Sequence, residues 1–102
     1  MINHIIIWNL DKNLSTEEKQ KVKSEAKEKL EGLYGKIDGL TKIKVEINPL
    51  ESSNADMLLF TQFTDGEALK AYQKSPLHNA VADKYVRPYT VSRACLDYIC
   101  EE

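Results

Sequence analysis

Residues 56–63 read DMLLFTQF, a short segment that carries apolar side chains on both faces of a strand. Because successive strand residues point to opposite sides, the apolar residues form two sets. These sets are Leu58 with Phe60, and Met57 with Leu59 and Phe63. A strand that is apolar on both sides belongs in the interior of a sheet whose two faces are both covered. The flanking sequence therefore has to supply the neighbouring strands and the cover for each face.

Two strands are predicted on the N-terminal side of this segment. Lys42–Asn48 alternates clearly between β-branched apolar residues and charged or polar ones, and the polar loop Pro49–Ala55 separates it from residues 56–63. Met1–Leu10 is apolar in the middle of both faces. One face of this first strand carries Ile2, His4, Ile6, Trp8 and Leu10. A sheet of at least three strands follows, and its last strand lies near the C-terminus, at Tyr89–Cys100.

Helices are predicted in the two intervals between strands. Ser15 and Glu18 have the spacing of a capping box and begin a helix that runs to about Leu33, with Gly35 as a left-handed cap. Thr64-Asp65-Gly66-Glu67 is a second capping-box pattern, and it begins a helix that runs to about Lys74. Ser75-Pro76 then starts a third helix, which ends before Pro88.

The predicted order is strand, helix, strand, strand, helix pair, strand. This order is typical of the ferredoxin-like βαββαβ fold, an α+β class with a four-stranded antiparallel sheet and helices on one face. Its 102 residues suit one domain that spans the whole chain.

The helices can cover only one face of such a sheet. We expect Ile5, Ile7, Met57 and Leu59 to lie on the other face, where they form an apolar patch larger than soluble monomers usually expose. A second copy docked sheet to sheet covers the patch, and a two-fold pair is the commonest solution. The sequence therefore predicts a homodimer that forms through the sheet face.

Composition excludes several classes of partner. The net charge is −2, with 14 basic and 16 acidic residues, and this balance provides no basic footprint for nucleic acid. No apolar run approaches the length of a membrane span, and no signal peptide is recognisable. A cytoplasmic protein without nucleic-acid or membrane partners is expected.

Three residues are candidates for acid–base chemistry. His78 is the third residue of the third predicted helix, Tyr72 lies six residues earlier across the helix break, and His4 is on the first strand. If they share one cavity, a neutral imidazole can take a proton from a carbon acid while the tyrosine hydroxyl stabilises the resulting oxyanion. The same residues also fit a satisfied core histidine, a helix-start histidine and ordinary aromatic packing. The expected lining of the cavity is Ile6, Trp8, Val22, Ala26, Phe60 and Val81.

The remaining polar residues are assigned structural roles. Arg93 and Asp97 lie four apart on the last strand and are interpreted as a same-face ion pair or as rim contacts. Cys95 and Cys100 lie an odd number of residues apart on that strand, so they point to opposite faces and are expected to be reduced thiols. Phosphate-loop, dinucleotide and zinc spacings are absent, so no metal and no cofactor are expected.

The chain resembles the stress-responsive A/B barrel domain family, also called Dabb, of the dimeric α+β barrel superfamily. The resemblance covers nearly the whole chain and is most specific at the helix break, where Tyr72, Pro76 and His78 are in step with the family pattern. Its other matching segments are Asn3–Trp8, Phe60–Phe63, Val86–Pro88, Ser92–Ala94 and Asp97-Tyr98. The family implies a homodimer with a cavity between sheet and helices in each subunit.

Some plant relatives are polyketide cyclases that need no cofactor. Their pattern matches His78 to the catalytic base, Tyr72 to the assisting hydroxyl and His4 to the first-strand histidine. This chain departs from the family in having Ser75 where many relatives have a histidine, and in lacking aromatic residues on the pocket side of the first helix.

Three functions stay open at this point. They are binding of a small hydrophobic or carbonyl-containing ligand, a cofactor-free cyclase, lyase or isomerase, and a structural stress-associated dimer. The heme-using relatives of the superfamily are not expected to apply, because no heme ligand site is recognisable.

Overall fold

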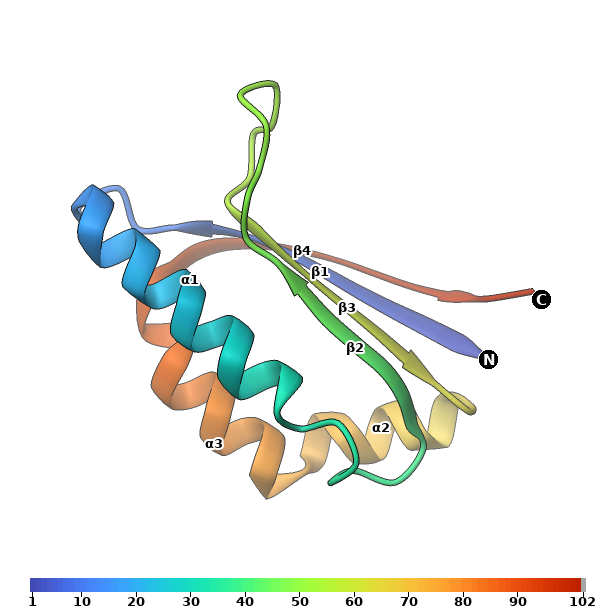
Figure 1. The fold of residues 1–102 in the computed structure, drawn as a ribbon. Helices are drawn as coiled ribbons and strands as arrows, with labels where there is room; N and C mark the ends of the chain where they lie inside the picture. Colours follow the sequence, from blue (N-terminus) through green and yellow to red (C-terminus); the bar gives the residue numbers. More distant parts are fainter. Residues whose placement is uncertain (102) are drawn as a thin grey trace.

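The computed structural model describes residues 1–101 as one sheet with helices packed on one face. The strand order is β2-β3-β1-β4, and all neighbouring strands are antiparallel. Figure 1 shows the helices gathered on one side of the sheet, which leaves the other side open. The elements are β1 (Ile2–Leu10), α1 (Thr16–Glu31), β2 (Leu40–Glu46), β3 (Met57–Phe63), α2 (Gly66–Lys74), α3 (Pro76–Tyr85), the 3₁₀ turn η1 (Arg87–Tyr89) and β4 (Thr90–Ile99). The predicted ferredoxin-like fold is confirmed, and β3 is an interior strand as expected.

The register of β1 and β3 decides which apolar residues face the helices. Trp8 pairs with Met57 and Ile6 pairs with Leu59, so these four side chains share the helix-side face, where all are buried. The assignment of Met57 and Leu59 to the open face was therefore wrong. Two other residues of β3 occupy that face, since Ile7 pairs with Leu58 and Ile5 pairs with Phe60.

The open face remains strongly apolar after this correction. Ile5 pairs with Leu96 on β4, and Leu96 is 62% exposed. Ile5, Leu58 and Phe60 are half-buried, and Ile7 is exposed. The physical reason for expecting a partner on this face is thus unchanged, although two of its residues differ from the prediction.

Local hydrogen bonds determine where the first two helices begin. Ser15 forms the predicted capping box, because its hydroxyl accepts from Glu18 N at 3.1 Å and the Glu18 carboxylate accepts from Ser15 N at 2.9 Å. α1 ends at Glu31, before the predicted Leu33, and Gly35 has its positive φ in the following turn. At α2 the cap is Asp65, which accepts from Ala68 N, and Thr64 has no such role.

Two tight contacts hold the helices against the sheet edge. Glu31 accepts from Val45 N at 2.9 Å, while Lys27 donates to Val45 O at 2.8 Å, so the last turn of α1 is bonded to β2. Gly39 has a φ of 82°, and a Cβ there would lie 2.5 Å from that of Ala68 on α2. Only glycine fits this turn, which brings α2 close to the start of β2.

Within residues 1–101, no helix is long and apolar enough to cross a bilayer.

Candidate functional site

A pocket of about 300 Å³ lies between the helix-side face of the sheet and helix α3. Its apolar wall comes from β1, β3, α1 and α3, and its polar groups come from β1, α2, α3, η1 and β4. The lining residues are His4, Ile6, Trp8, Leu30, Leu59, Gln73, His78, Ala82, Val86, Arg87, Thr90 and Arg93. This volume is at the lower end of the range for small-molecule sites, and an apolar wall with a few polar groups is the usual composition of such sites.

His78 and Tyr72 lie together at the junction of α2 and α3, as the helix break predicted. Only Ser75 separates the end of α2 from Pro76, which starts α3, and the ring centroids of Tyr72 and His78 are 4.1 Å apart. The Tyr72 ring is fully buried and also packs against Phe63 at 5.0 Å. Among the described residues, neither the Tyr72 hydroxyl nor His78 Nδ1 has a hydrogen-bond partner, although both atoms are buried. Such groups are rare because an unpaired buried polar atom is costly.

The surroundings keep both groups in their neutral forms at neutral pH. Desolvation lowers the pKa of His78 to about 4, and the positive charge of Arg87 acts in the same direction. Desolvation also raises the pKa of Tyr72 above its usual range. His78 is therefore available as a proton acceptor and Tyr72 as a hydrogen-bond donor. His78 lines the pocket, whereas Tyr72 lies behind it and is not part of the lining.

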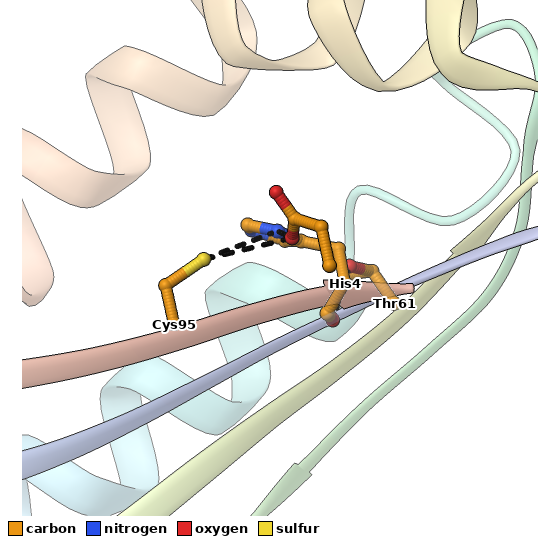
Figure 2. Close-up of polar contacts among 4 residues, drawn as sticks. His4, Thr61 and Cys95 are labelled. Atoms are coloured by element: carbon orange, nitrogen blue, oxygen red, sulfur yellow. Dashed lines mark hydrogen bonds and ion pairs between the residues drawn. The ribbon is translucent and has the colours of Figure 1, made fainter. Parts of the chain in front are cut away.

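His4 is the third of the predicted acid–base residues. Its ring is almost completely buried and lies 6.2 Å from that of Tyr72 in an edge-to-face arrangement. The Nδ1 atom is in direct contact with the carboxylate of Asp97, and the backbone carbonyl of His4 accepts from the Thr61 hydroxyl at 2.9 Å. Figure 2 shows Cys95 on β4 with dashed lines running from its sulfur toward the His4 imidazole, and Thr61 beside the backbone of His4. The structure thus brings His4, Tyr72 and His78 to one region.

Arg93 and Asp97 do not form the ion pair that their spacing suggested. Asp97 lies opposite His4 in the β1–β4 ladder and contacts it, while Arg93 lies opposite Trp8 and lines the pocket. Within residues 1–101, Arg93 has no salt-bridge partner. Arg87 differs, because Asp83 and Asn79 hold its guanidinium.

Sequence reasoning missed four polar pocket residues, which are Gln73, Arg87, Thr90 and Arg93. The one available signal was positional, since Arg93 lies an even number of residues from Cys95 and Asp97 and so shares their face of β4. Desolvation and the neighbouring Asp97 carboxylate raise the pKa of the Cys95 thiol. Cys95 is therefore not an activated thiolate nucleophile.

The predicted apolar lining is found only in part at this pocket. Ile6 and Trp8 line it. Val22 and Ala26 belong to α1 and are buried in the core, outside the pocket lining. Val81 on α3 packs against the core and is not part of the lining either. Phe60 lies on the open face of the sheet, because it pairs with Ile5 and not with a residue of the His4 face. Phe60 therefore cannot wall this pocket.

A larger hollow of about 440 Å³ lies elsewhere, between Ile7 and the segment that joins β2 to β3. Its lining contains no histidine and no arginine. The smaller pocket is lined by His78, whose Nδ1 is unpaired, and by Arg93, which has no salt-bridge partner among the described residues, and Tyr72 lies directly behind His78. It is therefore the better candidate for binding or chemistry.

Comparisons with known proteins agree with this fold. The family model described as Stress responsive A/B Barrel Domain matches residues 2–100. A dimeric protein of unknown function with a ferredoxin-like fold from Bacteroides fragilis is 32% identical, with a TM-score of 0.88. The match covers 95% of this chain and 93% of that one. No curated protein sequence matches this chain.

Two more distant structures share the fold alone. A Dabb family protein from Mesorhizobium loti has a TM-score of 0.74 at 20% identity, over 99% of this chain and 97% of that one. A hydroxynitrile lyase from Passiflora edulis has a TM-score of 0.73 at 14% identity, over 99% of this chain and 94% of that one. From the family model, which covers nearly the whole sequence, it follows that the chain belongs to the stress responsive A/B barrel domain family.

Proposed function

We propose that this protein is a homodimer that binds a small organic molecule with a carbonyl or carboxylate oxygen in the pocket beside His78. The observation that carries this proposal is the pair of buried atoms, Tyr72 Oη and His78 Nδ1, that have no protein partner. Leaving a buried polar atom unpaired costs about 1–3 kcal/mol. A ligand whose polar atoms hydrogen-bond to His78 Nδ1, and to Tyr72 Oη behind it, offsets that cost.

The charges of the pocket indicate the class of ligand. Arg93 has no carboxylate partner within residues 1–101, so its guanidinium is available to a carboxylate or a polarised carbonyl. The sheet surface beside Arg93 is apolar at Trp8 and Leu59, which suits a hydrocarbon or an aromatic ring. A small β-keto acid has all three features: a carboxylate, a ketone and an apolar end.

A homodimer is supported by the open face of the sheet. Leu96 and Ile7 are exposed there beside half-buried residues of β3, and the similar protein from Bacteroides fragilis is dimeric. One end of this face carries a row of hydrogen bonds in which Gln62 donates to Asn3 and Asn3 donates to Tyr98. Polar groups bonded within the subunit do not oppose the docking of a second copy.

Trp8 provides a direct assay for binding, because it is the single tryptophan and lines the pocket. Titration with benzoylacetate, a small aromatic β-keto acid, should change the tryptophan emission in a saturable way. Replacing Arg93 with Gln should weaken binding by roughly tenfold or more, since a hydrogen bond to a charged group contributes about 1.5–3 kcal/mol. The matched control is Lys42→Gln, which removes a charge from β2 outside the pocket lining. Unsaturable emission changes, or equal affinities for both variants, would contradict the proposal.

A second candidate function is cofactor-free acid–base catalysis on the same ligand class. It is favoured by the neutral His78 imidazole, which can take a proton from the carbon between the two carbonyl groups. Tyr72 Oη can then donate to the enolate oxygen, provided that the substrate reaches past His78 to the buried hydroxyl. The test is exchange of the methylene protons of benzoylacetate into deuterated water, followed by NMR. Exchange that is no faster with the protein than with its His78→Gln variant would leave binding as the only function.

A further inference from the structure

A second chemical cluster, formed by His4, Cys95 and Asp97, lies where β4 runs beside β1 (Figure 2). In the antiparallel ladder, Asp97 is opposite His4 and Cys95 is opposite Ile6. Cys95 and Asp97 are two residues apart, so both point to the same face of the sheet as His4. The backbone hydrogen bonds of two paired strands thus fix the positions from which all three side chains project, and no loop is involved.

The three donor atoms are already close together. Cys95 Sγ lies 3.5 Å from Asp97 Oδ1 and 3.9 Å from His4 Nδ1, and Nδ1 is in direct contact with the same carboxylate oxygen. All three donor atoms lie within 4.8 Å of one another. A tetrahedral zinc ion with bonds of about 2.0–2.3 Å separates its N, O and S ligands by roughly 3.3–3.6 Å. Both sulfur distances are near this range before any ion enters.

We propose that His4, Cys95 and Asp97 form a binding site for one divalent transition-metal ion of the zinc type, with its remaining coordination position open to solvent or to a small ligand. An imidazole nitrogen, a thiolate and a carboxylate are a donor set that zinc accepts, whereas magnesium and calcium prefer oxygen donors alone. Three protein ligands with one open position are typical of zinc sites that bind a further molecule.

Metal binding at this cluster has a defined proton balance. The thiol of Cys95 loses its proton to solvent and becomes a thiolate. Where the neutral ring carries its proton on Nδ1, toward Asp97, metal binding moves that proton to Nε2, so the ring binds the metal as a neutral ligand. The ion then replaces that proton between Nδ1 and the carboxylate, and these two atoms must move apart to admit it.

The exposure of the cluster allows both this movement and the entry of an ion. The side chain of His4 is only 4% exposed, so it is a fixed ligand. The side chain of Asp97 is 40% exposed and Cys95 is exposed at the edge strand β4, which leaves them free to rotate. His4 also lines the pocket beside His78, so the ion would lie at its border. This inference does not depend on the organic ligand proposed above, because the three side chains that would bind the metal all come from the protein.

The test is a titration of the purified, chelator-treated full chain with Co²⁺, followed by absorbance. We expect one Co²⁺ per chain, a thiolate-to-cobalt charge-transfer band, and loss of that band when Zn²⁺ is added. Cys95→Ser should abolish the band, while the matched control Cys100→Ser should keep it. Asp97→Asn removes a direct ligand and should weaken binding by at least the roughly 10- to 100-fold that an outer-shell partner contributes.

A second measurement needs no variant and so cannot fail through misfolding. Zn²⁺ should slow the alkylation of Cys95 in the unmodified protein and leave the rate at Cys100 unchanged. The proposal is overturned if Co²⁺ gives no thiolate band, if the band survives Cys95→Ser, or if Zn²⁺ does not protect Cys95. None of these results bears on the benzoylacetate titration, which is followed at Trp8 without metal.

Discussion

Replacing Tyr72 with Phe removes a hydroxyl group that is buried and has no protein partner. The substitution keeps the ring that packs 5.0 Å from Phe63 and 4.1 Å from His78. Most substitutions in a core destabilise, but this one deletes no hydrogen bond among the described residues and relieves the desolvation of one polar atom. We therefore expect the free energy of unfolding to rise by about 1 kcal/mol, the lower end of the 1–3 kcal/mol that an unsatisfied group costs.

Urea unfolding at one fixed protein concentration is the assay, since the stability of a dimer depends on concentration. With a slope of about 2 kcal/mol per molar urea, the midpoint should rise by roughly 0.5 M at an unchanged slope. Tyr72→Ala should instead lower stability by about 3–5 kcal/mol, because it empties the space of a fully buried aromatic ring. Tyr34→Phe, at a position that is 62% exposed, should change stability by less than about 0.5 kcal/mol.

A loss of about 1 kcal/mol or more in Tyr72→Phe would refute this reasoning. It would show that the hydroxyl is satisfied in the native protein and contributes to the stability of the fold. The argument that Tyr72 is kept polar for a ligand would then fail, even if the pocket still bound one. A gain in stability together with weaker benzoylacetate binding would show that this residue trades stability for function.

Three other predictions concern separate parts of the molecule. Below the ordinary imidazole pKa of 6.5 the unfolded chain takes up a proton at His78 that the folded chain does not take up until about pH 4. Stability should therefore fall by up to about 1.4 kcal/mol per pH unit as the pH decreases between these values, and His78→Gln should flatten that dependence in acid-dependent urea midpoints. Leu96→Glu places a charge on the open sheet face and should produce monomers in sedimentation velocity, whereas Leu77→Glu, on the exposed side of α3, should leave a dimer. Ser15→Ala should lower the free energy of unfolding by about 1 kcal/mol in the urea assay, because the capping box of α1 is lost. An unchanged midpoint there would mean that α1 is held by its packing alone.

The order of elements was predictable because each signal is local. The alternation of residues 42–48, the cap at Ser15 and the proline at Pro76 each depend on a few neighbouring residues. The choice of face for β3 was not predictable in this way, since both sets of its side chains are apolar. Only the pairing of Trp8 with Met57 determines that the odd-numbered residues of β3 face the helices.

The grouping of His4, Tyr72 and His78 in the candidate site was predictable from the family pattern, and the other pocket residues were not. The two residues Arg93 and Asp97 show the limit, because side chains four apart on a strand are about 13 Å apart. Residues directly opposite each other on neighbouring strands have Cβ atoms only about 4.5–5.5 Å apart. Asp97 therefore contacts His4, its neighbour across the ladder, and Arg93 is left for the pocket. Pairing between strands distant in sequence decides such contacts, and residue spacing alone does not reveal it.

The helix-side face of β4 departs from the pattern of an ordinary sheet. Beside β1 and β3, which present Ile6, Trp8 and Leu59 to the helices, β4 presents Arg93, Cys95 and Asp97. These three residues are exposed, so they cost the fold little and are free to take a functional role. Both proposals assign one: Arg93 binds an oxygen of the organic ligand, and the cysteine and aspartate complete a metal site with His4. If both hold, the edge strand β4 supplies the polar groups of both sites, and the apolar residues of β1 and β3 supply the surface that contacts the hydrocarbon part of the ligand.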